Sequence, residues 1–164
     1  MFTDKYTQYR TYGIKRPPEY SQGEHGSVLH WMEYCIDKYQ TMCYTVVENV
    51  CLLQPTSPLR TAEDINNAID LFRNSDAHSL VSGYYMRIKT DSKIDSKNLD
   101  HHFQRNGAIF IFDKEVLKSG KLFDESSIKY EMPKSRSVDV DTQDDMEMAE
   151  AIIEYRRNKL CGML

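Results

Sequence analysis

Apolar residues recur along the chain with two different periods. Unbroken apolar runs at 50–53 and 108–112 predict buried strands, the second of them buried on both faces, and a mixed run at 79–84 predicts a third strand. A short strand is also expected at 14–16, ahead of two prolines. Three longer segments have apolar residues at helical spacing: Val28, Trp31, Cys35, Ile36 and Tyr39; then Ile65, Ala68, Ile69 and Phe72; then Met146, Ala149, Ile152 and Ile153.

This alternation of strands and helices predicts the α/β class. We expect a three-layer arrangement in which a mostly parallel sheet is covered by helices. Residues 86–104 are polar and lack periodicity, so they are expected to leave the sheet as an excursion. The 164 residues are predicted to form one domain spanning 1–164.

The junction between the apolar run at 50–53 and the next helix is the most informative segment. Pro55 and Pro58 prevent the strand from continuing, and Thr61 with Asp64 forms a capping pair for the helix that follows. Gln54 is therefore expected at the carboxyl end of a strand, where open α/β sheets bind their ligands.

The same junction carries a family resemblance. Residues 52–60 (LLQPTSPLR) resemble the signature of the acylneuraminate cytidylyltransferases, which join CMP to sialic acid and related nonulosonic acids. The segments 16–19 (RPPE), 105–111 (RNGAIFI) and 137–142 (SVDVDT) resemble that family in the same order. The resemblance implies a nucleotide-diphospho-sugar-transferase-like fold, truncated at the amino terminus. The family begins with a strand and a glycine- and basic-rich triphosphate loop that this chain is expected to lack, so that residues 3–12 would match the family's second helix.

The resemblance also implies a set of site residues. Asp139 and Asp141 would hold the magnesium cofactor, Gln54 and Asn106 would contact the sugar substrate, and Arg16 and Ser27 would bind the nucleotide cofactor. No catalytic side chain is assigned, because positioning and charge neutralisation carry this class of transfer.

Each of these assignments has an ordinary structural alternative. Asp139 and Asp141 alternate along an expected strand, which places their carboxylates about 7 Å apart on one face, but acids are also favoured near a helix amino terminus. Gln54 and Asn106 could support loops, Arg16 could be a solvated arginine, and Ser27 could be a helix N-cap. The adjacent pair His101 and His102 is not expected to bind a metal.

Composition excludes several classes of partner. The net charge is −4 and the pI about 5.7, which disfavours nucleic acid and anionic membranes as partners. Four cysteines without metal spacing are expected to be reduced, with Cys35 and Cys51 in the core, in a cytoplasmic protein. The tyrosines of the first helix and the apolar 108–112 strand predict a homodimer or higher homo-oligomer.

The sequence therefore predicts a CMP-sialic acid synthetase-like nucleotidyltransferase that is degenerate in the form given, with a nucleotide or an acidic sugar as its small-molecule partner. The alternative is a non-catalytic binding or assembly module that keeps only the fold.

Overall fold

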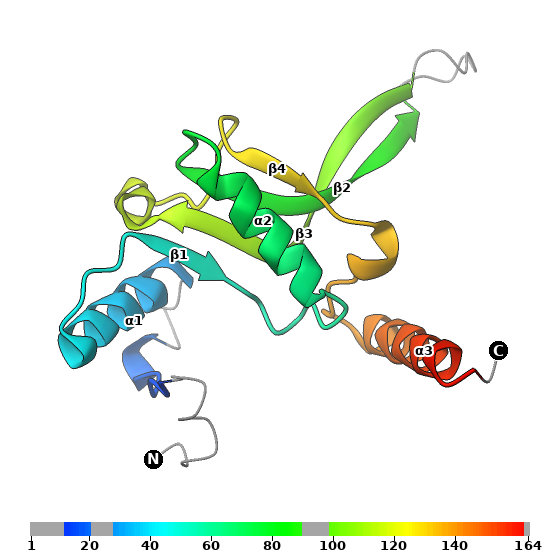
Figure 1. Ribbon diagram of the computed structural model, residues 1–164, viewed down its shortest axis with the longest axis horizontal. Coiled ribbons are helices and arrows are strands. Elements are labelled where there is room, and N and C mark those ends of the chain that lie inside the picture. The colour runs from blue at the N-terminus through cyan, green and yellow to red at the C-terminus, as the bar shows by residue number, and fades with distance from the viewer. Residues whose placement is uncertain (1–11, 21–27, 90–98, 163–164) are drawn as a thin grey trace. The chain divides into compact units, whose positions relative to one another are not determined.

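The computed structural model describes residues 12–20, 28–89 and 99–162 (Figure 1). The chain divides into two compact units. The first comprises Met1–Asn49 and Asp113–Leu122, and the second comprises Val50–Phe112 and Phe123–Leu164. Among the described residues, no helix combines the length and the apolar character needed to cross a membrane.

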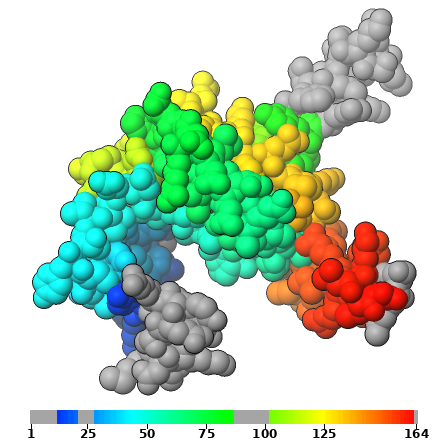
Figure 2. Space-filling view, viewed as in Figure 1, coloured from blue at the N-terminus to red at the C-terminus, as the bar shows by residue number. Residues whose placement is uncertain are grey.

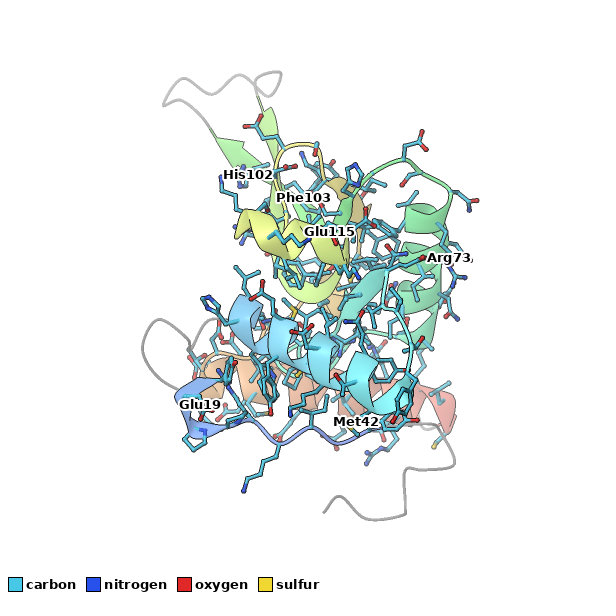
Figure 3. All side chains as sticks on the ribbon, turned by 90° about the vertical axis from the view of Figure 1, so that its left-hand side faces the viewer. Glu19, Met42, Arg73, His102, Phe103 and Glu115 are labelled. Carbon is cyan, nitrogen blue, oxygen red and sulfur yellow. The ribbon has the colours of Figure 1, made fainter. Side chains whose placement is uncertain are left out.

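The first unit is built around helix α1 (Val28–Cys43), with the 3-10 helices η2 (Pro18–Tyr20) and η4 (Lys114–Ser119). The helical spacing predicted α1 correctly, although Met32 is its one buried residue and Met42, near its carboxyl end (Figure 3), is 52% exposed. The strand expected at 14–16 does not form, since this segment leads directly into the prolines and η2. The helix expected at 3–12 lies outside the described residues except for Tyr12, which is not helical.

The second unit holds a four-stranded mixed sheet in the order β1-β3-β2-β4. Its strands are β1 (Asn49–Leu52), β2 (Ser79–Lys89), β3 (Leu99–Asp113) and β4 (Ile128–Glu131). β2 pairs with β4 in parallel and with β3 in antiparallel register. The α/β class is as predicted, and the antiparallel β2–β3 pair makes the sheet mixed.

The predicted excursion at 86–104 is largely regular structure. β2 continues to Lys89 and β3 begins at Leu99, and the two strands pair along this whole extension. Only residues 90–98 lie outside the described part of the chain. The prediction failed because a two-stranded ribbon that extends beyond the core needs no apolar periodicity.

The core of this unit lies between the sheet and helix α2 (Ala62–Arg73), which crosses one face of the sheet (Figure 1). Ala68 and Phe72 of α2 are buried there, as predicted. The whole run 108–112 is buried, because β3 lies between β1 and β2. That position contradicts the expectation that this strand presents an apolar surface for assembly.

β1 is less buried than the sequence suggested. It is an edge strand of alternating burial, in which Cys51 is exposed, and Leu53 just beyond it is 37% exposed. The predictions of a buried strand at 50–53 and of a core position for Cys51 are therefore wrong. Cys35 is half-buried.

Helix α3 (Gln143–Leu160) closes the second unit and begins at the predicted cap. The Thr142 hydroxyl accepts a hydrogen bond from the Asp145 amide, and the Asp145 carboxylate accepts one from the Thr142 amide. Of the residues expected to face inward, Ala149 is buried, but Met146 and Ile153 are 44% and 40% exposed.

Candidate functional site

Three of the four segments that carry the family resemblance meet in the second unit. The Arg60 guanidinium donates to the carbonyl oxygens of Gln54 at 3.0 Å and Ala108 at 2.7 Å. The Val140 amide donates to the Thr56 carbonyl at 2.8 Å. Residues 54–60, 106–108 and 137–140, which are far apart in sequence, are thereby held against one another.

The loop after β1 is fixed at its far end by α2. The Thr61 and Asp64 side chains form a capping box, and both Asp64 oxygens accept hydrogen bonds from Arg136, at 2.8 and 2.6 Å. Burial of Asp64 raises the pKa of its carboxyl group, but the hydrogen bonds from Arg136 and Thr61 outweigh it and hold that pKa below the ordinary value. The pair connects α2 to the short 3-10 helix η5 (Lys134–Arg136) that precedes 137–142.

Asn106 is the centre of a buried hydrogen-bond network. Its side-chain oxygen accepts from the Ser82 hydroxyl at 2.6 Å and from the Ala108 amide at 3.1 Å. Its side-chain nitrogen donates to the Ser137 hydroxyl at 2.9 Å, and its carbonyl accepts from the Ser57 hydroxyl at 3.2 Å. Asn106 is 2% exposed, and its side-chain amide is occupied by these hydrogen bonds. This favours the alternative in which Asn106 supports neighbouring loops.

Gly107 allows two side chains to approach its backbone closely beside this network. Its φ of +69° lies in the left-handed region that glycine adopts without strain. A Cβ at this position would lie 2.9 Å from the Gln54 side-chain oxygen and 2.9 Å from Asp139 Oδ2. The Gln54 amide and the Asp139 carboxylate therefore both lie against the Gly107 backbone, and their assignment as a sugar contact and a metal ligand stays a prediction.

The Asp139 carboxylate carries the signal expected of a ligand-binding group. Its Oδ1 atom is buried and has no hydrogen-bond partner among the residues that the structure describes. A buried carboxylate oxygen left unpaired is costly unless something else satisfies it. Carboxylate and amide oxygens are the atoms that a hard cation such as Mg²⁺ prefers, so this donor set fits a magnesium ion.

The geometry of the aspartate pair differs from the expectation in one respect. Residues 137–142 form no strand, so the spacing inferred from strand geometry does not apply. Asp139 is half-buried and Asp141 is exposed, and both line the same cleft. In the described part of the chain, no three His, Cys, Asp or Glu side chains gather as a metal cluster, so the two aspartates would need oxygen ligands of another kind.

The cleft has a volume of about 640 Å³. Its acidic residues are Asp139, Asp141 and Asp145, and its basic residues are Arg105 and Lys134. Asp145 is occupied as the cap of α3, and its pKa is lowered by the Thr142 hydroxyl and by the backbone amides of residues 141 and 142. The walls are completed by apolar Met148 and Ile152 of α3 and by parts of β2 and β3.

Of the two predicted nucleotide contacts, the structure describes only Arg16. Arg16 belongs to the first unit, where its guanidinium donates to the Tyr20 carbonyl and lies 5.6 Å from the centre of the Trp31 ring. Ser27 lies outside the described residues. His102 is exposed on β3 (Figure 3), and the placement of the His101 side chain is not described.

Sequence reasoning missed several residues that build the site. Arg60 lies in the segment that carries the resemblance but had no assigned role. No local sequence pattern indicated that Asp64 pairs with Arg136. Gly107 did have a signal, since Asn-Gly is a common sequence for a residue with positive φ. The cleft residue Lys134 follows a proline in a polar stretch and carries no pattern of its own.

Comparison with known proteins supports the resemblance found in the sequence. No protein-family model matches the chain. The chain is 29% identical over 141 residues to an N-acylneuraminate cytidylyltransferase of Escherichia coli O18:K1:H7, covering 74% of this chain and 33% of that protein. It is also 29% identical over 151 residues to an N-acylneuraminate cytidylyltransferase of Streptococcus agalactiae serotype III, covering 80% of this chain and 35% of that protein. The chain thus spans about a third of the length of these curated relatives.

A solved structure also resembles the fold. The 4-diphosphocytidyl-2C-methyl-D-erythritol synthase of Anaerococcus prevotii matches 71% of this chain and 64% of its own, with a TM-score of 0.47 and 15% identity.

Proposed function

We propose that the cleft binds an acidic sugar together with a magnesium ion, as the acceptor side of a cytidylyl-transfer site. The observation that carries this proposal is the buried Oδ1 of Asp139, which has no hydrogen-bond partner among the described residues, in a carboxylate that lies beside the Gln54 amide at Gly107. The names of the relatives, N-acylneuraminate cytidylyltransferases, suggest the chemistry: transfer of a cytidylyl group from CTP to an N-acylneuraminate.

Asp139 and Asp141 are the residues that would hold magnesium. A bound Mg²⁺ would supply neutralisation of the negative charge on a phosphoryl group. The Asp139 carboxylate has a buried oxygen with no hydrogen-bond partner in the described part of the chain, so this residue is expected to be the most sensitive reporter of the ion.

The sugar contacts are assigned to Lys134, which lines the cleft, and to Gln54, which does not line it but lies beside Asp139 at Gly107. The Gln54 amide can donate to and accept from sugar hydroxyls. An acidic sugar also brings a carboxylate, and the basic groups lining the cleft are Lys134 and Arg105. Arg105 packs its guanidinium 3.9 Å from the centre of the Phe123 ring, so Lys134 is the better candidate for that carboxylate.

A second candidate function is binding without catalysis. It is favoured by the composition of the cleft, whose lining offers two basic residues and no phosphate-binding glycine loop. In that case the acidic sugar would still bind and no CMP-sugar would form. The homodimer and the cytoplasmic location expected from the sequence stand as further proposals.

Isothermal titration of the chain with N-acetylneuraminate, with and without magnesium, tests the proposal. We expect magnesium-dependent binding that Asp139→Asn abolishes and that Asp144→Asn, an exposed acid in the first turn of α3, leaves intact. Equal binding by wild type and Asp139→Asn would refute the metal assignment. Adding CTP and measuring CMP-sugar then separates the two candidate functions, because only the transferase hypothesis predicts that CMP-sugar forms.

A further inference from the structure

Strand β3 carries a wide bulge beside the cleft. Ser82 of β2 stands alone opposite residues 106–109 of β3. Its two neighbours in β2 pair with Arg105 and Phe110, on either side of that stretch. A bulge of this kind takes backbone groups out of the hydrogen-bond ladder, and when they are buried they must find partners elsewhere.

Two side chains supply these partners, and the backbone fixes the direction of each hydrogen bond. The Ile109 amide donates to the Ser82 hydroxyl at 2.8 Å, and the Ala108 amide donates to the Asn106 side-chain oxygen at 3.1 Å. Because an amide N–H can only donate, the Ser82 hydroxyl uses its own proton for the Asn106 oxygen, 2.6 Å away. The bond from Ala108 also identifies which end of the Asn106 amide is oxygen, so that its NH2 group points toward Ser137.

The NH2 group of Asn106 holds the segment that carries Asp139. It donates to the Ser137 hydroxyl at 2.9 Å and to the Met132 sulfur at 3.3 Å. The Ser137 hydroxyl donates its own proton to the Pro133 carbonyl at 3.0 Å, so toward Asn106 it acts as an acceptor. Both donors and both acceptors of the Asn106 amide are therefore occupied within the protein.

The second attachment of this segment also leads to Asn106. On the other side of Asp139, the Val140 amide donates to the Thr56 carbonyl at 2.8 Å. The hydroxyl of Ser57, the next residue in that loop, donates to the Asn106 backbone carbonyl at 3.2 Å. In Figure 2 the orange segment that precedes α3 lies against the teal-green loop after β1. The segment forms no strand, so these two attachments determine where Asp139 lies.

We propose that Asn106 is the positioning residue of the ion site, which fixes the segment 137–140 from both sides and so presents the Asp139 carboxylate to magnesium. This inference rests on the proposed function, because it requires Asp139 to be an ion ligand. Residues that orient a metal ligand commonly determine the affinity of the metal almost as strongly as the ligand itself. Asn106 acts through Ser137 and the loop at Thr56, and its own amide stays within the protein.

Ser137→Ala tests the proposal, because it removes the acceptor of the Asn106 NH2 group. Ser79→Ala is the matched control. Ser79 is also buried, and its hydroxyl shares a hydrogen bond of 2.6 Å with the Ser127 hydroxyl, at positions of the same unit that do not line the cleft. Each variant loses one buried hydroxyl and its hydrogen bond, so both should lose similar amounts of stability in urea unfolding.

The first measurement needs no ion. Amide hydrogen exchange at Val140 in magnesium-free protein reports how often the segment opens. We expect exchange about tenfold faster in Ser137→Ala, the factor that one net hydrogen bond is worth, and the wild-type rate in Ser79→Ala. Isothermal titration with magnesium is the second measurement. The dissociation constant should rise about tenfold or more in Ser137→Ala and stay unchanged in Ser79→Ala.

The two measurements separate positioning from a general loss of stability. Equal exchange rates and equal magnesium constants in the two variants would overturn the proposal. Weaker magnesium binding without faster exchange at Val140 would also overturn it, because the effect would then not pass through the segment. A wild type that binds no magnesium would overturn the proposed function and the ion part of this inference, whereas faster exchange in Ser137→Ala alone would still show that Asn106 holds the segment.

Discussion

Replacing Gly107 with alanine should separate the cost of its backbone conformation from its effect on the site. The residue has φ +69°, and its new Cβ would lie 2.9 Å from both the Gln54 and the Asp139 side-chain oxygens. Gly120 supplies a matched control, since it has φ +71° and an added Cβ would meet nothing within 4 Å. In both variants alanine adopts an unfavourable left-handed backbone conformation, and only Gly107→Ala also places a Cβ against neighbouring side chains.

The magnitudes follow from these two contributions. A non-glycine residue in the left-handed region costs about 1–2 kcal/mol, and the reduced freedom of the unfolded chain returns about 0.4–1 kcal/mol. Gly120→Ala should therefore lose about 1 kcal/mol of unfolding free energy. Gly107→Ala should lose about 1 kcal/mol more, at the low end of overpacking costs, because the atoms it meets are ends of side chains that can move.

Displacement of the Gln54 and Asp139 side chains should have a larger effect on binding than on folding. Thermal melts with and without magnesium measure both effects. The midpoint shifts by about 2–4 °C per kcal/mol of unfolding free energy for a chain of this size. We expect Gly120→Ala to keep the wild-type magnesium-dependent shift of the midpoint and Gly107→Ala to lose it. If Gly107→Ala matches Gly120→Ala in both stability and magnesium response, the close approach of Gln54 and Asp139 to Gly107 has no role in the site.

Three further outcomes are expected. Arg136→Met should cost about 3 kcal/mol or more in urea unfolding, since it leaves the buried Asp64 carboxylate without its ion-pair partner; a loss below 1 kcal/mol would contradict the buried pair. Because the folded pKa of Asp64 lies below the ordinary 3.8, its stabilisation is present above that pH and is lost as the pH falls through the folded value. Acid unfolding of wild type and Asp64→Asn should therefore converge at low pH, and parallel curves would refute this sign. Calorimetry should find CTP with magnesium binding no tighter than millimolar, because the cleft offers Lys134 and Arg105 as its basic groups; a micromolar constant would show that a phosphate-binding surface exists elsewhere on the chain.

What could be predicted from the sequence was local. The capping pairs Thr61/Asp64 and Thr142/Asp145 identified the starts of two helices because both partners lie within one turn. The burial of 108–112 followed from an unbroken apolar run, whereas the similar run at 50–53 lies at the sheet edge, and strand order is not encoded in either run. The exposure of Met146 and Ile153 on α3 was missed for a related reason. Periodicity groups residues on one face of a helix but does not show what that face contacts.

The site shows the same division between local and distant information. Gln54 and Asp139 were assigned by resemblance, and the structure brings their oxygens to one volume at Gly107. The role of Asn106 depended on Ser82 and Ser137, which lie 24 and 31 residues away in sequence. No spacing rule connects such residues, so the choice between a sugar contact and a supporting network could not be made from the sequence.

The hydrogen bond from the Val140 amide to the Thr56 carbonyl has a consequence for folding kinetics. It joins segments more than eighty residues apart, and closing so long a loop carries an entropic cost. Local structure is therefore expected to form before this contact. The cleft should therefore be assembled after α2 and the β2–β3 ribbon have formed. Amide hydrogen exchange at Val140 would report the opening of the site directly: exchange faster than that of core amides in β3 would mean that the site opens in a partial unfolding event, while the sheet stays intact.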